Sequence, residues 1–261
     1  MNILIHDLAK ADAFTALFQH IRLFTDNVNI QFETERMYIQ TMDNARVSIV
    51  EMAIPATWFS EYTLESAVSL GINSTILFKV LSTRDKGQTI QLAYDTDDSD
   101  KLALHFTGGT DGKETVFEKH FEIPLIDLDD DMMNIPDTEA QAEFSLSSAH
   151  FAGLVNQLRL FGDTMEIRCT EERIELYSHS QDSGKMCVEM RIDDLTEFAI
   201  DEGGEVNLSF SLSYLHNICM YNKIAKEISV RLTDAFPMKL VYDLGENARL
   251  TFYLAPKIGD D

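Results

Sequence analysis

The sequence lacks the features that place a chain outside the cell or in a membrane. Its three cysteines are an odd number without a CxxC pair, which argues against a disulfide framework and indicates reduced, buried thiols. No apolar run approaches the ~18 residues that span a membrane, and the N-terminal segment MNILIHDLAKAD is acidic where a signal peptide is basic. We therefore expect a soluble protein of the cytosol or nucleus that does not bind membranes.

Basic residues are also in short supply. The 261 residues include 21 Lys and Arg against 44 Asp and Glu, which gives a formal net charge of -23. Such a surface repels phosphates, whereas simple nucleic-acid binders neutralise them with Lys and Arg. The apolar fraction of 45%, with 12 Gly and 5 Pro, is nevertheless that of a globular chain with one large or two ordinary cores.

Catalytic and metal-binding motifs are missing or incomplete. The loop GGTDGKE at 108–114 is one residue too short for a phosphate-binding loop and has Glu114 in place of its Ser or Thr. The run DTDDSD at 95–100 lacks the Gly and Glu of a calcium loop, and the adjacent residues Asp129, Asp130 and Asp131 point in different directions. Because HExxH and GxSxG motifs are also missing, we expect no enzymatic activity, no bound metal and no cofactor.

One segment of the chain matches another without a gap. The stretch DAFTALFQHIRLFTDNVNIQFETERMYIQ from Asp12 aligns with AHFAGLVNQLRLFGDTMEIRCTEERIELY from Ala149. Apolar and charged positions keep the same spacing throughout, and Arg22 aligns with Arg159. Chance explains such a match poorly, so we predict two similar domains in tandem.

Each copy opens with an amphipathic helix, because residues such as Phe14, Leu17 and Ile21 fall at helical spacing. A period of two follows, as in half-buried antiparallel strands. Helices are predicted at 12–24, 74–83, 149–161 and 213–223. Strands are predicted at 29–33, 37–42, 47–53, 90–94, 102–106, 166–169, 173–177, 187–192, 206–210, 227–232, 239–242 and 249–254. The predicted class is α+β, with two helices over a large antiparallel sheet in each domain.

A connector, HFEIPLIDLDDDMMNIPD at residues 120–137, joins the two copies. A flexible linker is rich in Gly and Ser, whereas this one is rich in aliphatic side chains and Met, so we expect it to lie against a surface. The predicted organisation is a first domain at 1–119, the connector at 120–137 and a second domain at 138–261.

The predicted helices hold most of their charge as cations: Arg22, Lys79, Arg159 and Lys223 stand against Asp12 alone. If these helices share one face, an acidic protein carries a mildly basic surface there. One exposed cation on a helix is commonplace, but the equivalence of Arg22 and Arg159 favours a functional role.

Four stretches carry a resemblance to a known family: IQTMDNARVSIV at 39–50, IDLDDDMMNIPD at 126–137, FSLSYLHN at 210–217 and YLAPKI at 253–258. From end to end, the chain resembles proliferating cell nuclear antigen, the eukaryotic-type DNA sliding clamp. The resemblance implies a clamp fold that assembles into a closed homotrimeric ring in the nucleus, or at a site of viral DNA replication. Helices line the hole and duplex DNA passes through it, so that retention is topological and weak phosphate contacts permit sliding.

By position, the resemblance implies DNA-facing cations at Arg22, Lys79, Arg159 and Lys223, with Lys86 and Lys226 as outliers. Other positions that are usually basic in the family hold Thr15, Ser82, Gly153, Asn156 and Met220, so the expected channel is less basic than usual. Glu171 stands where the family usually has a modifiable lysine, so ubiquitin-like attachment is not expected there.

The resemblance also implies how the ring closes. An edge strand of one copy's first domain, at 117–123, pairs with an edge strand of the next copy's second domain, at 186–192, and such a head-to-tail contact closes into a ring if its rotation is about 120°. The expected interface residues are Phe117, Phe121, Ile123, Met186, Val188 and Met190.

Partners of the family insert a short peptide with an aliphatic and two aromatic residues, the PIP-box pattern, into an apolar pocket. DNA polymerase, the clamp loader and repair proteins are the expected partners. The matching wall here is Met42, Arg46, Val47, Met133, Ile135, Pro237, Tyr253, Ala255 and Pro256, where Met provides adaptability. Arg46 replaces the family's common His, which predicts a preference for acidic residues flanking the peptide.

Two alternatives remain open at this point. A subunit of the heterotrimeric checkpoint clamp shares the fold, although the intact connector and the YLAPKI tail favour the homotrimer. An acidic DNA mimic fits the net charge alone, but it explains neither the repeat nor the cations on the helices. Plain core packing is also an alternative for Met42 and Met133.

Overall fold

The computed structural model describes the chain except for residues 97–99, 109–116, 130–131, 137, 235 and 258–261. The chain folds as two compact units. The N-terminal unit consists of Met1–Asn44, Val50–Met133 and Gly245–Arg249, and the C-terminal unit of Ala45–Ile49, Asn134–Leu244 and Leu250–Asp261. Antiparallel sheets with few helices confirm the predicted α+β class. In the described part of the chain, no helix is long and apolar enough to cross a membrane.

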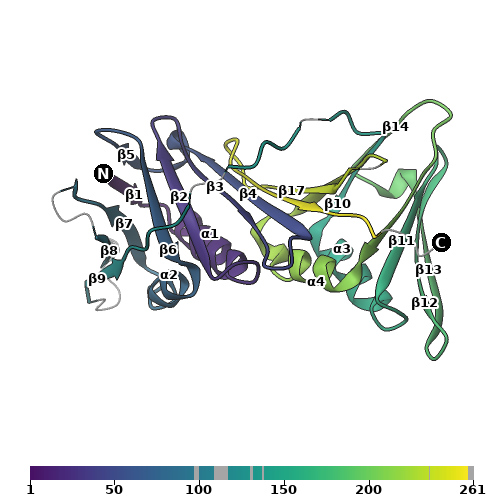
Figure 1. The fold of residues 1–261 in the computed structure, drawn as a ribbon, viewed down its shortest axis with the longest axis horizontal. Coiled ribbons are helices and arrows are strands. Elements are labelled where there is room, and N and C mark those ends of the chain that lie inside the picture. Colours follow the sequence, from purple (N-terminus) through teal and green to yellow (C-terminus); the bar gives the residue numbers. More distant parts are fainter. Residues whose placement is uncertain (97–99, 109–116, 130–131, 137, 235, 258–261) are drawn as a thin grey trace. The chain divides into compact units, whose positions relative to one another are not determined.

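The N-terminal unit contains two runs of antiparallel strands (Figure 1). The first is a five-stranded sheet in the order β5 (Glu61–Thr63), β1 (Asn2–Ile5), β7 (Gln88–Ala93), β8 (Lys101–Gly108) and β9 (Lys119–Pro124). The second has the order β4 (Ser48–Pro55), β3 (Arg36–Met42), β2 (Asn27–Glu33) and β6 (Val68–Asn73). The helices α1 (Leu8–Ile21) and α2 (Ser74–Leu81) pack against each other, and a 3₁₀ turn, η1, covers Ala56–Trp58.

Helix α1 forms because its apolar residues repeat at helical spacing and its first turn is capped. The Asp7 side chain accepts a hydrogen bond from the backbone N–H of Lys10 at 3.0 Å, as N-cap residues do. Phe14 and Phe18 are both buried, and their rings meet edge to face with centroids 5.0 Å apart. Asn73 caps α2 in the same way, with its Oδ1 3.0 Å from the N–H of Ile76.

The single tryptophan of the sequence belongs to the core of the N-terminal unit. Trp58 is 2% exposed, and its ring meets that of Phe59 edge to face at 5.2 Å. The Nζ of Lys10 donates to the Trp58 carbonyl at 2.8 Å and lies 5.3 Å from the ring centroid, a cation–π distance. Helix α1 is thereby anchored to η1.

The C-terminal unit has the same ingredients. One sheet has the order β13 (Gly184–Arg191), β12 (Arg173–Ser180), β11 (Thr164–Cys169) and β15 (Val206–Ser211). A second run has the order β14 (Glu197–Ile200), β10 (Ala142–Ser147), β16 (Glu227–Leu232), β17 (Met238–Asp243) and β18 (Arg249–Leu254). The helices α3 (Ser148–Leu158) and α4 (Leu212–Cys219) pack against each other, and the 3₁₀ turns η3 and η4 cover Ile192–Asp194 and Asn222–Ile224.

The repeat in the sequence is a repeat in the structure. Arg22 is the C-cap residue of α1 and Arg159 that of α3, with φ of -60° in both. The strands that follow start at aligned positions, Asn27 with Thr164 and Arg36 with Arg173. The second helix of each unit is also tied in the same way: the N–H of Ser74 bonds to the Asp26 carbonyl, and that of Leu212 to the aligned Asp163 carbonyl.

Several predicted boundaries need correction. Helix α1 starts earlier than predicted, at Leu8, because Asp7 supplies the cap. The four helices end before their predicted limits, so that Arg22 and Arg159 are caps rather than helical residues and Lys223 lies in η4. The strands β1, β5, β6, β10 and β14 fall outside the predicted ranges; β1, β5 and β14 have only four, three and four residues, too few for a period of two to stand out. Residues 120–124 of the predicted connector belong to β9, where they pair with β8.

Candidate nucleic-acid and partner interfaces

The two predicted DNA-facing cations of the N-terminal unit lie on its paired helices. The guanidinium carbon of Arg22, at the end of α1, is 4.4 Å from the ring centroid of Phe78 on α2. Lys79 follows Phe78 and is exposed. The cation–π contact holds the half-buried Arg22 against α2, so the structure brings both charges to the α1–α2 pair.

The acidic residue of α1 is neutralised by an arginine that no sequence pattern singled out. Asp12 forms an ion pair with Arg84, whose side chain is only 4% exposed. Arg84 Nη1 also donates to the carbonyl of Gln88 at 2.7 Å. The negative charge of Asp12 is therefore compensated locally, and it does not cancel the charges of Arg22 and Lys79.

In the C-terminal unit, Arg159 and Lys223 are both exposed, at the end of α3 and in η4. Between the two helices, Nδ1 of His216 lies 2.8 Å from Oδ1 of Asn156. Burial and then the positive charge of Arg159 lower the pKa of His216 below its ordinary value of 6.5. His216 is thus neutral at physiological pH and adds no charge to this surface.

Three of the positions that are not basic here use their side chains locally. Thr15 Oγ1 donates to the Ala11 carbonyl within α1, and Ser82 Oγ to the Lys79 carbonyl at the end of α2. Asn156 is the partner of His216. These three uncharged side chains add no positive charge to the surface of the helices.

The connector is fastened to the N-terminal unit by contacts that the sequence did not reveal. The N–H of Ile126 donates to the carbonyl of Gly71 on β6 at 2.9 Å, and Asn29 Nδ2 donates to the Asp129 carbonyl at 3.2 Å. A Cβ atom on Gly71 would lie 2.1 Å from the Ile126 oxygen. Glycine at this position is what allows the connector to lie on β6, which confirms that it lies against a surface.

A second fastening acts at the end of the connector. Nε2 of Gln40, on β3, donates to the Met133 carbonyl at 3.1 Å, and the Met133 N–H donates to Gln40 Oε1 at 2.7 Å. One side-chain amide thus satisfies both backbone groups of Met133. Met133 and Met42, the pocket residues in this unit, are both half-buried rather than packed in the core.

The remaining predicted pocket residues belong to the C-terminal unit. The Ala255 N–H donates to the Val47 carbonyl at 3.0 Å, so these two residues are neighbours. Tyr253, on β18, has Lys239 Nζ 5.6 Å from its ring centroid. Ile135 and Pro256 are half-buried and Pro237 is exposed, and Phe236 beside Pro237 is an exposed aromatic outside the predicted set.

Arg46, also in the C-terminal unit, is exposed and has a positive φ of 58°. Non-glycine residues rarely adopt this conformation. Glu171, at the position where the family usually has a modifiable lysine, accepts a hydrogen bond from the N–H of Gly203 at 2.7 Å.

In the described part of each unit, the strand predicted to form the subunit interface lies at the edge of a sheet. This strand is β9 in the N-terminal unit and β13 in the C-terminal unit. Phe117 precedes β9 and is 76% exposed, and Phe121 is half-buried against Phe106. Ile123 is 1% exposed. Its side chain packs in the core, so the expectation that it contacts a second copy is wrong for the side chain.

A groove of about 750 Å³ runs between α3 and β13. Its apolar lining includes Leu154 on α3 and Val188 and Met190 on β13. Met186, the third predicted interface residue of this strand, is half-buried. The groove therefore places apolar surface directly beside an open strand edge.

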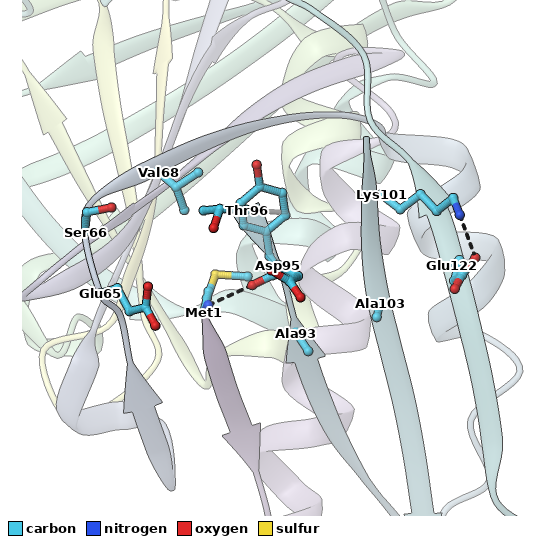
Figure 2. Close-up of a pocket in the computed structure, with 11 residues that line it drawn as sticks. Met1, Glu65, Ser66, Val68, Ala93, Asp95, Thr96, Lys101, Ala103 and Glu122 are labelled. Atoms are coloured by element: carbon cyan, nitrogen blue, oxygen red, sulfur yellow. Dashed lines mark hydrogen bonds and ion pairs between the residues drawn. The ribbon is translucent and has the colours of Figure 1, made fainter. Parts of the chain in front are cut away.

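Figure 2 shows a separate cavity of about 430 Å³ in the N-terminal unit. Three of its charged groups have partners within the unit: Lys101 Nζ lies 3.3 Å from Glu122 Oε2, and the amino group of Met1 donates to the Tyr94 carbonyl at 2.8 Å. None of the predicted site residues lines this cavity. The glycine-rich loop at 108–114, apart from Gly108, and Asp130 and Asp131 lie outside the described residues.

Two tandem units of one design, each with a pair of helices and open sheet edges, define the class of DNA sliding clamps. The chain belongs to the proliferating cell nuclear antigen family. The model of that family's N-terminal domain matches residues 3–132, and the model of its C-terminal domain matches residues 134–257.

Named relatives agree with the domain models. The chain is 29% identical over 259 residues to proliferating cell nuclear antigen of Chaetomium thermophilum, covering 97% of this chain and 98% of that protein. It is 27% identical over 222 residues to proliferating cell nuclear antigen 2 of Drosophila melanogaster, covering 85% of each.

Proposed function

We propose that three copies of the chain close into a ring around duplex DNA and tether DNA polymerase and repair proteins to it, without chemistry of their own. The ring acts in the nucleus, or at a site of viral DNA replication if the chain is viral. A clamp loader opens the ring onto DNA. Partners dock through PIP-box-like peptides.

The observation that carries this proposal is the equivalent placement of Arg22 and Arg159. Both cap the first helix of their unit, with the same φ. Each is accompanied by one exposed lysine, Lys79 or Lys223. Few, singly placed cations suit weak and exchangeable phosphate contacts, which a sliding protein needs and a sequence-specific binder does not.

The subunit contact is supported by two complementary features. Phe117 stands 76% exposed before the edge strand β9, and the groove between α3 and β13 offers Leu154, Val188 and Met190 beside a second open edge. Pairing β9 of one copy with β13 of the next satisfies both edges and buries Phe117 in the groove. Because the two surfaces differ, the contact is head-to-tail, and three copies close into a ring when its rotation is about 120°.

The peptide-binding part of the proposal rests on apolar residues that are only half-buried. They are Met42 and Met133 in the N-terminal unit and Val47, Tyr253 and Ala255 in the C-terminal unit. Methionine adapts to varied ligands. Arg46 is exposed, and a cation beside the proposed pocket favours peptides with acidic flanks over peptides with basic flanks.

The test is retention on circular DNA. The protein is loaded by its clamp loader onto a nicked circle, washed in high salt and challenged by linearising the circle. We expect the clamp to survive the salt wash and to leave when the circle is cut. Release that follows salt alone, with no effect of cutting, contradicts topological retention.

Matched variants separate the ring from the fold. Phe117→Ala removes an exposed side chain, so the chain should fold but lose the trimer and its retention. Leu160→Ala removes a side chain of similar exposure, 71%, that belongs to neither edge strand, and should retain both. A Phe117→Ala protein that remains trimeric at the lowest measurable concentration argues against the proposed contact.

A further inference from the structure

Two histidines face each other on the outer surface of the edge strand proposed for ring closure. His105 on β8 and His120 on β9 are directly opposite in the strand register. Their ring centroids are 4.7 Å apart at an interplanar angle of 68°, and their Nδ1 atoms form a short contact. Nδ1 of a neutral imidazole can ligate a metal ion, so this chain supplies two nitrogen ligands at one point.

The face of β9 on which His120 lies determines which side chains of a second copy can approach the two histidines. Along β9, Phe121 and Ile123 face inward, while His120 and Glu122 are exposed. Along β13, Val188 and Met190 line the groove, while Lys185 and Cys187 are exposed; Glu189 is exposed and also borders the groove. Side chains alternate along a strand, so pairing β9 with β13 in a register that joins the two apolar faces also joins the two exposed faces.

Among the exposed side chains of β13, Cys187 is the one suited to a metal. The Nζ of Lys185 lies 4.5 Å from the ring centroid of Tyr177, and Glu189 is within 3.9 Å of the Arg173 guanidinium. Cys187 contacts the uncharged hydroxyl of Tyr177, which it can release without leaving an ion unpaired. Thiolate and imidazole are the preferred ligands of Zn²⁺.

We propose that a Zn²⁺ ion binds at each subunit junction of the ring, held by His105 and His120 of one copy and by the thiolate of Cys187 of the next, with water as the fourth ligand. The proposal rests on the ring proposed above. It agrees with the absence of any group of three or more potential ligands within the described residues of one chain, because the third ligand comes from a second copy.

The proton balance fits neutral pH. Each Zn²⁺ displaces one proton, that of the Cys187 thiol, to solvent. The imidazole that donates in the histidine pair moves its proton to Nε2, and the Glu118 carboxylate lies near this side of His120, with Oε2 3.9 Å from Nε2.

The test uses the full-length protein, reduced and freed of metal, with Zn²⁺ or Co²⁺ added. Zn²⁺ should lower the concentration for half-assembly by about tenfold or more, and EDTA should reverse the effect. Co²⁺ should give a thiolate-to-cobalt charge-transfer band. Both signals should be lost in His120→Asn and in Cys187→Ser and kept in His6→Asn, which alters an exposed histidine outside these strands.

The most direct test mixes the two variants that are expected to lose metal binding, His120→Asn and Cys187→Ser. In a mixed ring, a Cys187→Ser copy supplies both histidines and a His120→Asn copy supplies the thiolate, so the cobalt band should return at a fraction of the junctions. A trimer that assembles equally well in EDTA and in Zn²⁺, with no cobalt band, overturns the metal site and leaves the ring intact. A chain that stays monomeric at high concentration under all conditions overturns the ring as well.

Discussion

At the scale of single residues, the net charge of the surface proposed to face DNA depends on the cations and equally on neighbouring residues that are neutral or neutralised. Asp12 is neutralised by Arg84, and His216 is kept neutral by burial and by Arg159. The aligned pair Arg22 and Arg159 could be found from the sequence because a repeat preserves spacing. Arg84 could not, because its partner Asp12 is distant in sequence and ion pairs of this kind have no local pattern.

The lowered pKa of His216 predicts an acid-sensitive component of stability. The folded state disfavours the charged imidazole, so this contribution is complete above pH 6.5, the ordinary pKa, and is lost as the pH falls below it. The variant His216→Gln should therefore lose less stability than the wild type between pH 7.5 and pH 5, as measured by urea unfolding. An identical pH dependence in both proteins contradicts the prediction; His6→Gln, at an exposed site, controls for removal of a histidine.

At the scale of secondary-structure elements, the hydrophobic period predicted the four helices and most of the strands, whereas the contacts that attach the connector could not be predicted. Gly71, Asn29 and Gln40 each bind backbone groups far away in sequence. Such bonds depend on tertiary proximity and leave no periodic trace. The same reason explains why β9 absorbs the start of the predicted connector: a strand is defined by its partner, here β8, and not by its own residues alone.

Gly71→Ala should detach the connector from β6. Its Cβ would lie 2.1 Å from the Ile126 oxygen, so we expect a loss of about 1–3 kcal/mol in unfolding free energy and faster hydrogen exchange at the Ile126 amide. Gly87→Ala is the matched control, because a Cβ there has no atom within 4 Å. Unchanged exchange at Ile126 in the Gly71 variant would show that the connector is held by other contacts.

At the scale of the whole molecule, the net charge of -23 per chain means that salt acts in opposite directions on assembly and on DNA binding. Copies of an acidic chain repel one another, so salt should assist ring closure by screening. Phosphate contacts are weakened by salt, because the release of counterions is then less favourable. The acidic excess is evident from the composition, and the two strands proposed for assembly were expected from the resemblance, but their place at the edge of a sheet is seen only in the fold.

The salt dependence of binding to a short duplex tests the DNA-facing assignment. Lys79→Ala and Arg159→Ala should each reduce the slope of log affinity against log salt by about 0.9 for every phosphate that is no longer neutralised. Lys101→Ala, which removes a lysine already paired with Glu122, should leave the slope unchanged. If neither Lys79 nor Arg159 alters the slope, the helices do not face DNA.

The sole tryptophan gives one half of the chain an optical signature that the other half does not have. Trp58 is 2% exposed in the N-terminal unit, and the C-terminal unit has no indole at all. Intrinsic fluorescence therefore follows melting of the first half, while far-ultraviolet circular dichroism follows both. Coincident transitions would mean that the halves unfold cooperatively, and separate ones that each is an independent folding domain.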